Sequence, residues 1–196
     1  MSDDKMTGLN RMTRLGRVAA TWLLLVMAMA QVCAAANLTP AQLATLKSDM
    51  AANFPGLPDE EAAAAYNVAA SPDYWVWRNL VTESEVYESP SVDGTFWSWT
   101  IYIARSQAER EAWRQMVSMR GGLKPSLANV RIGVADIFSG AGGAAQRTHL
   151  LTVGRRKATR GEKLFAAGTG STADPATMAV EGLITATNVS EARNLP

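Results

Sequence analysis

The chain has one cysteine, Cys33, and one histidine, His149. A single cysteine excludes an internal disulfide bond, and its position near the N-terminus leaves the rest of the chain without a thiol nucleophile. A single histidine excludes a histidine pair that would hold a metal, and we expect His149 to be a surface or half-buried polar residue rather than a catalytic base. The sequence therefore predicts no catalytic residue, no cofactor site and no metal site.

The chain also lacks a strong excess of charge of either sign. Its 19 basic and 18 acidic residues give a net charge of +1, and four of the basic residues precede position 37. Setting residues 1–36 aside leaves 15 basic and 16 acidic residues, which is close to neutral. A neutral surface gives no general attraction to nucleic acid or to anionic membranes. No internal repeat or low-complexity segment is present.

Residues 1–36 form a basic and then hydrophobic leader. Four basic residues lie within positions 1–17, Val18–Ala30 is almost wholly apolar, and Ala34–Ala36 precede Asn37. This order is the pattern of a secretory signal peptide. The apolar run would rise about 20 Å as a helix, short of the roughly 30 Å of a bilayer core. Three interpretations stay open: a signal peptide, an extension from a wrongly assigned start codon, and a retained anchor.

Residues 37–196 contain several clear helix starts. Capping boxes, in which a Ser or Thr precedes a Gln or Glu by three residues, begin at Thr39, Thr82, Ser106 and Thr159. Apolar residues then recur at helical spacing, most regularly behind Ser126, which we expect to be a helix cap. We predict further helices over 59–69, 144–155 and 188–193, and a short strand over 177–181. The expected fold is mainly α, a compact multi-helix single domain with at most a minor β-hairpin.

Residues 72–103 are ambiguous because they hold eight of the fourteen aromatic residues. Trp75 alternates with Trp77 and Trp97 with Trp99, which is typical of strands. The capping box at Thr82 favours short helices instead. Both structures stay open for this segment.

Glycine-rich stretches at 140–143 and 168–172 resemble phosphate-binding loops in composition alone. Neither contains the lysine of a nucleotide-binding loop, and neither follows a convincing strand. We interpret both as turns.

Two groups of residues could contact a partner. Tryptophan dominates the energetics of many interfaces, so four tryptophans are candidates for a partner surface, with core packing as the alternative: Trp75, Trp77, Trp97 and Trp99. Basic residues crowd a second stretch and are candidates for a nucleic-acid or acidic-protein site, with a solvated face as the alternative: Arg147, Arg155, Arg156, Lys157, Arg160 and Lys163.

Several segments resemble a family of uncharacterised proteins encoded in the virion-morphogenesis regions of tailed bacteriophages and prophages. The resemblance covers 38–193 and is carried by 38–43, 70–72, 76–78, 129–131, 136–140, 158–166, 168–172, 175–177 and 180–182. It implies a phage or prophage protein that begins near Leu38, but it transfers no functional residue. Because the leader lies outside this range, the resemblance raises the start-codon interpretation to equal standing with the signal peptide.

These observations predict a non-enzymatic phage or prophage structural or assembly protein that acts through protein–protein contacts. Its partners would be other phage structural proteins or a second copy of the chain, and its location the virion or the host cytoplasm. The alternatives are a nucleic-acid-associated protein that uses the basic stretch, and an exported bacterial protein, periplasmic or secreted, if the leader is a functional signal peptide. We expect no stable membrane insertion of residues 37–196.

Overall fold

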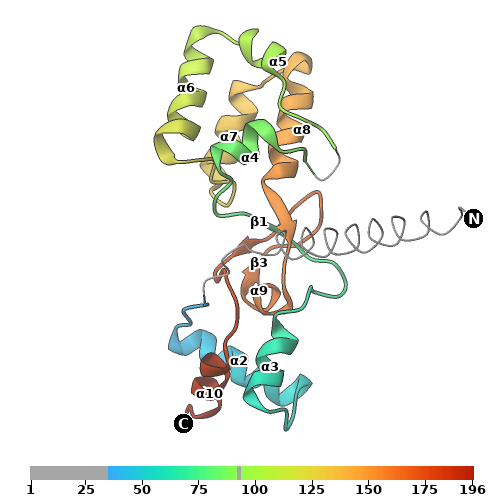
Figure 1. The fold of residues 1–196 in the computed structure, drawn as a ribbon, viewed down its shortest axis with the longest axis vertical. Helices are drawn as coiled ribbons and strands as arrows, with labels where there is room; N and C mark the ends of the chain where they lie inside the picture. The colour runs from blue at the N-terminus through green and yellow to red at the C-terminus, as the bar shows by residue number, and fades with distance from the viewer. Residues whose placement is uncertain (1–34, 92–93) are drawn as a thin grey trace, which may run out of the picture. The chain divides into compact units, whose positions relative to one another are not determined.

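The computed structural model describes residues 35–91 and 94–196, and Ala36–Pro196 form one compact unit (Figure 1). The expectations for the leader concern residues 1–36, of which 1–34 lie outside the described residues. The described elements are mostly helices, with two small antiparallel sheets, which confirms the mainly α prediction. In chain order they are α2 (Pro40–Asn53), α3 (Asp59–Tyr66), β1 (Trp75–Trp77), α4 (Glu83–Glu88), α5 (Trp99–Ile103), α6 (Gln107–Val117), η1 (Ser118–Arg120), α7 (Ala128–Ile137), η2 (Ala141–Gly143), α8 (Ala144–Val153), β2 (Arg155–Lys157), α9 (Arg160–Phe165), β3 (Ala166–Ala167), β4 (Thr177–Met178) and α10 (Ala186–Arg193).

A first hydrophobic core joins α2, α3 and α10, the two ends of the described chain. The capping box of Thr39 and Gln42 fixes the start of α2, with Pro40 in the first turn. Its buried face presents Leu46 to Tyr66 of α3 and Val189 of α10, and all three side chains are fully buried. The core begins before α2, because Ala36 is 4% exposed and its N–H donates to Leu183 O at 2.8 Å.

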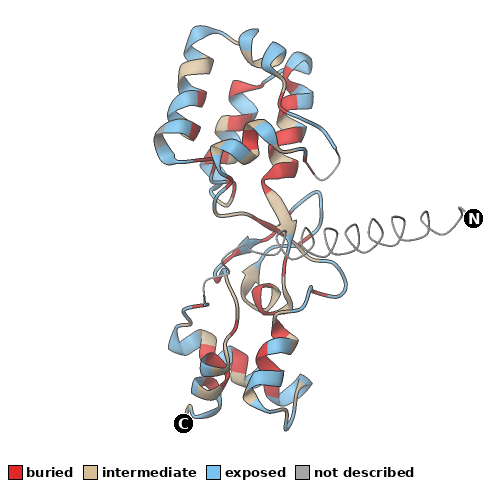
Figure 2. Ribbon diagram, viewed as in Figure 1, coloured by how far each residue is buried: buried red, intermediate tan, exposed pale blue. Residues whose placement is uncertain are grey.

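A second hydrophobic core lies among α4, α6, α7 and α8, whose inner faces are buried (Figure 2). Its largest fully buried side chain is Trp113 of α6, which stacks on Trp97 with ring centroids 5.2 Å apart. Phe138 closes the cluster with an edge contact to Trp113 at 5.4 Å. Aromatic rings at these separations add to the free energy gained by burial.

The two small sheets lie between these helical groups (Figure 1). In the first sheet, β1 pairs antiparallel with β2 so that Trp75 faces Lys157 and Trp77 faces Arg155. In the second sheet, β3 pairs antiparallel with β4. A bridge between Val76 and Ala176 connects β1 to the segment before β4, around a third cluster of buried side chains.

Several expected boundaries are wrong. The strand predicted over 177–181 ends at Met178, and the helix predicted over 188–193 begins at Ala186. The helix predicted over 59–69 ends at Tyr66, and the helix predicted over 144–155 ends at Val153. Arg155–Lys157 instead form β2, since their backbone groups pair with the distant strand β1. Ser126 makes no side-chain cap: α7 begins at Ala128 after Leu127.

The ambiguous segment 72–103 contains both kinds of structure. Trp75–Trp77 is the strand β1, as its alternation indicates. The Thr82 capping box begins the short helix α4, and Ser98 caps α5, so the alternation of Trp97 and Trp99 does not mark a strand.

Candidate functional site

The four candidate tryptophans do not form one surface. Trp77 and Trp97 are 8% and 7% exposed, so they pack in cores and are corrected from partner surface to core. Trp75 is half-buried beneath two cations, Arg155 and Lys157, which lie 5.5 and 5.9 Å from its ring centroid. Only Trp99 presents most of its side chain to solvent.

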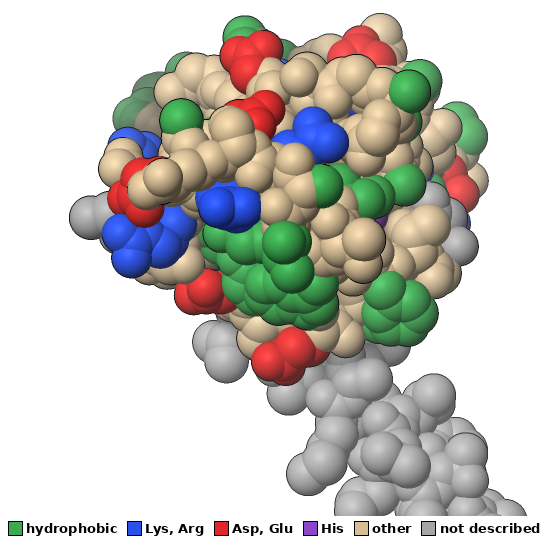
Figure 3. Space-filling model, turned by 90° about the horizontal axis from the view of Figure 1, so that it is seen from above, with side chains coloured by type: hydrophobic (Ala, Val, Ile, Leu, Met, Phe, Trp, Pro, Cys, Tyr) green, Lys and Arg blue, Asp and Glu red, His purple; other side chains and the backbone are tan. Residues whose placement is uncertain are grey.

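Three large apolar side chains are exposed on α5 and just before it. Phe96, Trp99 and Ile103 are 62%, 54% and 65% exposed, and we call these three residues the α5 surface. Trp99 and Ile103 are four residues apart on the helix, so they share one face. Seen from the end of the domain where α5 lies, exposed hydrophobic side chains gather beside charged groups of both signs (Figure 3). The four-residue spacing of Trp99 and Ile103 is visible in the sequence, but Phe96 and Ile103 were not among the predicted residues.

The α5 surface rests on a fixed aromatic base. The Trp99 ring stacks on Tyr87 with centroids 5.2 Å apart and meets the edge of Trp97 at 5.7 Å. At the end of α5, Arg110 Nη1 donates to Ile103 O at 2.8 Å. These contacts hold the side chain of Trp99 and the end of its helix in place.

Most of the predicted basic stretch is engaged within the domain. Arg147 donates to the carbonyls of Phe138 and Gly140, and Arg155 donates to Thr172 O. Lys157 pairs with Asp73 at 2.7 Å, on an exposed edge.

The remaining three basic residues have different surroundings. Arg156 forms a two-pronged ion pair with Glu162, at 2.6 and 2.7 Å, and a longer one with Glu181, at 3.2 Å. Arg160 and Lys163 lie on α9 and line a cavity. These six cations therefore make different contacts and do not form one free basic face.

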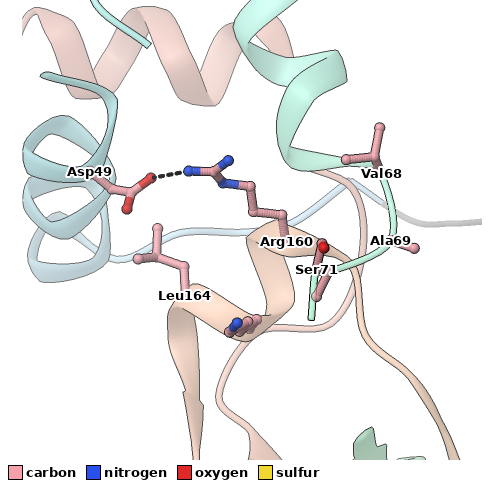
Figure 4. Close-up of a pocket in the computed structure, with 8 residues that line it drawn as sticks. Asp49, Val68, Ala69, Ser71, Arg160 and Leu164 are labelled. Atoms are coloured by element: carbon pink, nitrogen blue, oxygen red, sulfur yellow. Dashed lines mark ion pairs between the residues drawn. The ribbon is translucent and has the colours of Figure 1, made fainter. Parts of the chain in front are cut away.

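The cavity beside α9 has a volume of about 500 Å³. Asp49 of α2 forms one side, and the segment that follows α3 forms another (Figure 4). Arg160 extends from α9 toward Asp49, with Nη2 3.9 Å from Oδ2. Residues distant in sequence meet here, and except for Arg160 and Lys163 none was predicted as a site: Asp49, Val68, Ala69, Ala70, Ser71, Arg160, Lys163 and Leu164.

The acidic group of this cavity is already hydrogen-bonded. Tyr66 Oη donates to Asp49 Oδ2 at 2.6 Å, and Asn53 Nδ2 donates to Oδ1 at 2.9 Å. Burial and this bond to Asp49 raise the pKa of Tyr66 far above its usual value, so its hydroxyl stays a donor. The Arg160 guanidinium lies over Phe54, with Cζ 4.3 Å from the ring centroid.

His149 is fully buried, which corrects the expected surface or half-buried position. Its Nε2 lies 3.1 Å from Val86 O and its Nδ1 lies 3.1 Å from Thr95 O. The ring therefore links α8 to α4 and to the segment before α5. The reason for the error is that His149 shares its helical face with Gln146 and Val153, which are also buried.

Replacing His149 with alanine should lower the free energy of unfolding by about 2 kcal/mol, because a buried ring and its hydrogen bonding are lost together. Urea denaturation followed by tryptophan fluorescence measures this change. Thr148→Ala, at an exposed position of the same helix, is the matched control and should leave the midpoint unchanged. Equal midpoints for the two variants would contradict the structural role of the ring.

Two further observations concern residues 35–91 and 94–196 alone. No group of three or more histidine, cysteine or acidic residues lies close enough together to hold a metal ion. No helix there combines the length and the apolar character needed to cross a bilayer.

No family model, curated protein or solved structure matches the chain.

Proposed function

We propose that this chain is a non-enzymatic structural or assembly protein of a tailed bacteriophage or prophage, and that it acts through protein–protein contacts at the α5 surface. The observation that supports this best is the exposure of Phe96, Trp99 and Ile103 on one short segment. The resemblance of residues 38–193 to proteins from virion-morphogenesis regions supplies the phage context.

The physical argument begins with the energetic cost of this surface. Burial of apolar surface stabilises a protein by about 25 cal/mol per Å². A tryptophan that is half exposed to solvent therefore lacks much of the stabilisation that full burial would give. Trp99 stacks on Tyr87, yet 54% of it stays exposed. A contact with another protein would bury this surface without reordering it.

A second copy of the chain is the partner we assign first. The net charge of +1 for the whole chain leaves little electrostatic repulsion between two copies. Charges of both signs flank the apolar area, so a two-fold contact can place each sign against its opposite (Figure 3). Other virion proteins are the partners expected once the self-contact has formed.

Replacing Trp99 with alanine together with Ile103 with serine should raise the dissociation constant of self-association by tenfold or more, since about 1.4 kcal/mol of lost contact suffices. Sedimentation equilibrium of the purified chain measures the constant. The matched control is Ile132→Ser on α7, because Ile132 is 61% exposed but does not belong to the α5 surface. The control should associate like the unmodified chain.

The phage context has its own test. Mass spectrometry of purified particles from a lysogen that carries the gene should detect peptides of residues 37–196. A chain that is monomeric at the highest attainable concentration and consistently absent from particles would overturn the proposal. N-terminal sequencing of the expressed product would decide between a host-cytoplasm or virion location and export by a cleaved leader.

A further inference from the structure

The cavity beside α9 has more hydrogen-bond donors than acceptors to receive them. Arg160 carries five N–H donors and Lys163 carries three. Within residues 35–91 and 94–196, neither side chain donates a hydrogen bond, and the nearest carboxylate oxygen to Arg160 is 3.9 Å away. The Ser71 hydroxyl, which also lines the cavity, has no hydrogen bond there either, so three polar groups of the lining have no hydrogen-bond acceptor within the described residues.

Asp49 does not neutralise this surplus. Both of its carboxylate oxygens already accept short hydrogen bonds, from Tyr66 and Asn53. With two cations and one carboxylate, the lining carries a net charge of +1. The cavity therefore favours a ligand that brings negative oxygen atoms.

The positions of the two cations are compatible with joint binding of one anion. Arg160 and Lys163 are three residues apart on α9, a spacing that places them on the same face of the helix. The Arg160 guanidinium is held over Phe54 at 4.3 Å, and Lys163 Nζ lies 5.5 Å from the ring centroid of Tyr74. Aromatic contacts of this kind position a cation while leaving its N–H groups available.

The rest of the lining is apolar. Leu164 and the alanines at 69 and 70 form part of the wall, and Val68, 57% exposed, stands at its border. A volume of about 500 Å³ is in the range of cavities that hold small organic ligands and is far more than an inorganic ion fills. A matching ligand has an anionic head and a short hydrocarbon part.

We propose that this cavity is a binding site for a small organic oxyanion, a carboxylate or a phosphate monoester, whose head is bound by Arg160, Lys163 and Ser71 and whose hydrocarbon part contacts Leu164 and Val68. The site is separate from the α5 surface and does not depend on the proposed assembly role. The two ideas can therefore fail independently.

Isothermal titration calorimetry of the full chain tests the chemistry of the ligand. Hexanoate should be compared with hexanamide, which has the same hydrocarbon part without charge, and hexyl phosphate should be compared with inorganic phosphate, which has the phosphate head without hydrocarbon. Saturable binding of either organic anion, stronger than that of its comparison compound, is expected. The stronger of the two anions identifies the head group, and absence of binding by both would overturn the proposal.

Charge removal at matched lysines tests the location. Lys163→Gln should weaken binding of the better probe by about tenfold, the effect of one lost charge-assisted hydrogen bond. Lys157→Gln removes the same charge from a lysine that pairs with Asp73 outside the cavity, and it should change affinity less than about twofold. Equal effects of the two variants would show attraction to overall charge and would contradict the site.

Arg160→Lys provides a second variant that keeps the charge. It removes the planar pair of donors, so binding should weaken even though the net charge of the lining is unchanged. Thermal unfolding of each variant shows whether the fold persists. A folded Arg160→Lys variant with unaltered affinity, together with an unaltered Lys163→Gln variant, would place the anion elsewhere.

Discussion

Replacing Arg156 with methionine is expected to lower the free energy of unfolding by about 4 kcal/mol at pH 7, the range found when one partner of a buried ion pair is removed. Glu162 is 3% exposed, and both of its carboxylate oxygens accept from the Arg156 guanidinium, at 2.6 and 2.7 Å. Without this cation, Glu162 retains backbone donors, such as the N–H of Thr159, but no charge to balance its own.

The same pair predicts how the effect depends on pH. Burial raises the pKa of Glu162, but the hydrogen bonds from Arg156 and from the Thr159 backbone outweigh it, and the pKa lies below the usual value. A lowered carboxyl pKa stabilises the fold above the unfolded value of about 4.3 and loses this contribution as the pH falls. In Arg156→Met the unpaired carboxylate would take up its proton more readily. The difference between the two proteins should therefore shrink below about pH 4.

Urea denaturation at several pH values measures this prediction. Arg114→Met is the matched control, because Arg114 also pairs with a glutamate, Glu111, but on an exposed helix face. Exposed pairs contribute little, so the control should leave the midpoint unchanged. The double variant Arg156→Met, Glu162→Leu should recover part of the lost stability, since it leaves no unpaired charge. Equal losses in Arg156→Met and Arg114→Met would contradict the argument.

Helix starts in this chain could be predicted from the sequence because they depend on residues close together. The boxes at Thr39, Thr82, Ser106 and Thr159 are all present, with the side chain and backbone bonds that define them. A fifth box, Thr185 with Asn188, was missed because asparagine takes the place of glutamate or glutamine. Local hydrogen bonding is enough to specify these positions.

Features that need distant residues could not be predicted in the same way. The strand Arg155–Lys157 exists because it pairs with Trp75–Trp77, some eighty positions earlier, and alone it resembles a helix end followed by a basic loop. The cavity joins Asp49, Ser71 and Lys163, and no spacing in the sequence indicates that α2 and α9 meet. Burial of Trp97 but not Trp99 likewise depends on where α6 packs.

Replacing Trp113 with alanine is the second change expected to have a large effect, a loss of about 4 kcal/mol in the free energy of unfolding. Trp113 is 1% exposed and is the largest fully buried side chain of its core. Its ring stacks on Trp97 at 5.2 Å, and its Nε1 donates to Tyr87 Oη at 3.1 Å. Alanine would leave a cavity among rings that cannot collapse to fill it, and Tyr87 would lose its donor.

Trp99→Ala is the matched control for this prediction, because Trp99 and Trp113 belong to one network of aromatic contacts through Tyr87 and Trp97. Trp99 is 54% exposed, so its removal opens no internal cavity and should cost far less than removal of Trp113. Urea denaturation monitored by far-UV circular dichroism avoids the loss of a fluorescent reporter. If the core surrounds Trp113 and the α5 surface is made for a partner, Trp113→Ala reduces stability and Trp99→Ala reduces association. The opposite pairing of effects would show that the second core is centred on Trp99 instead.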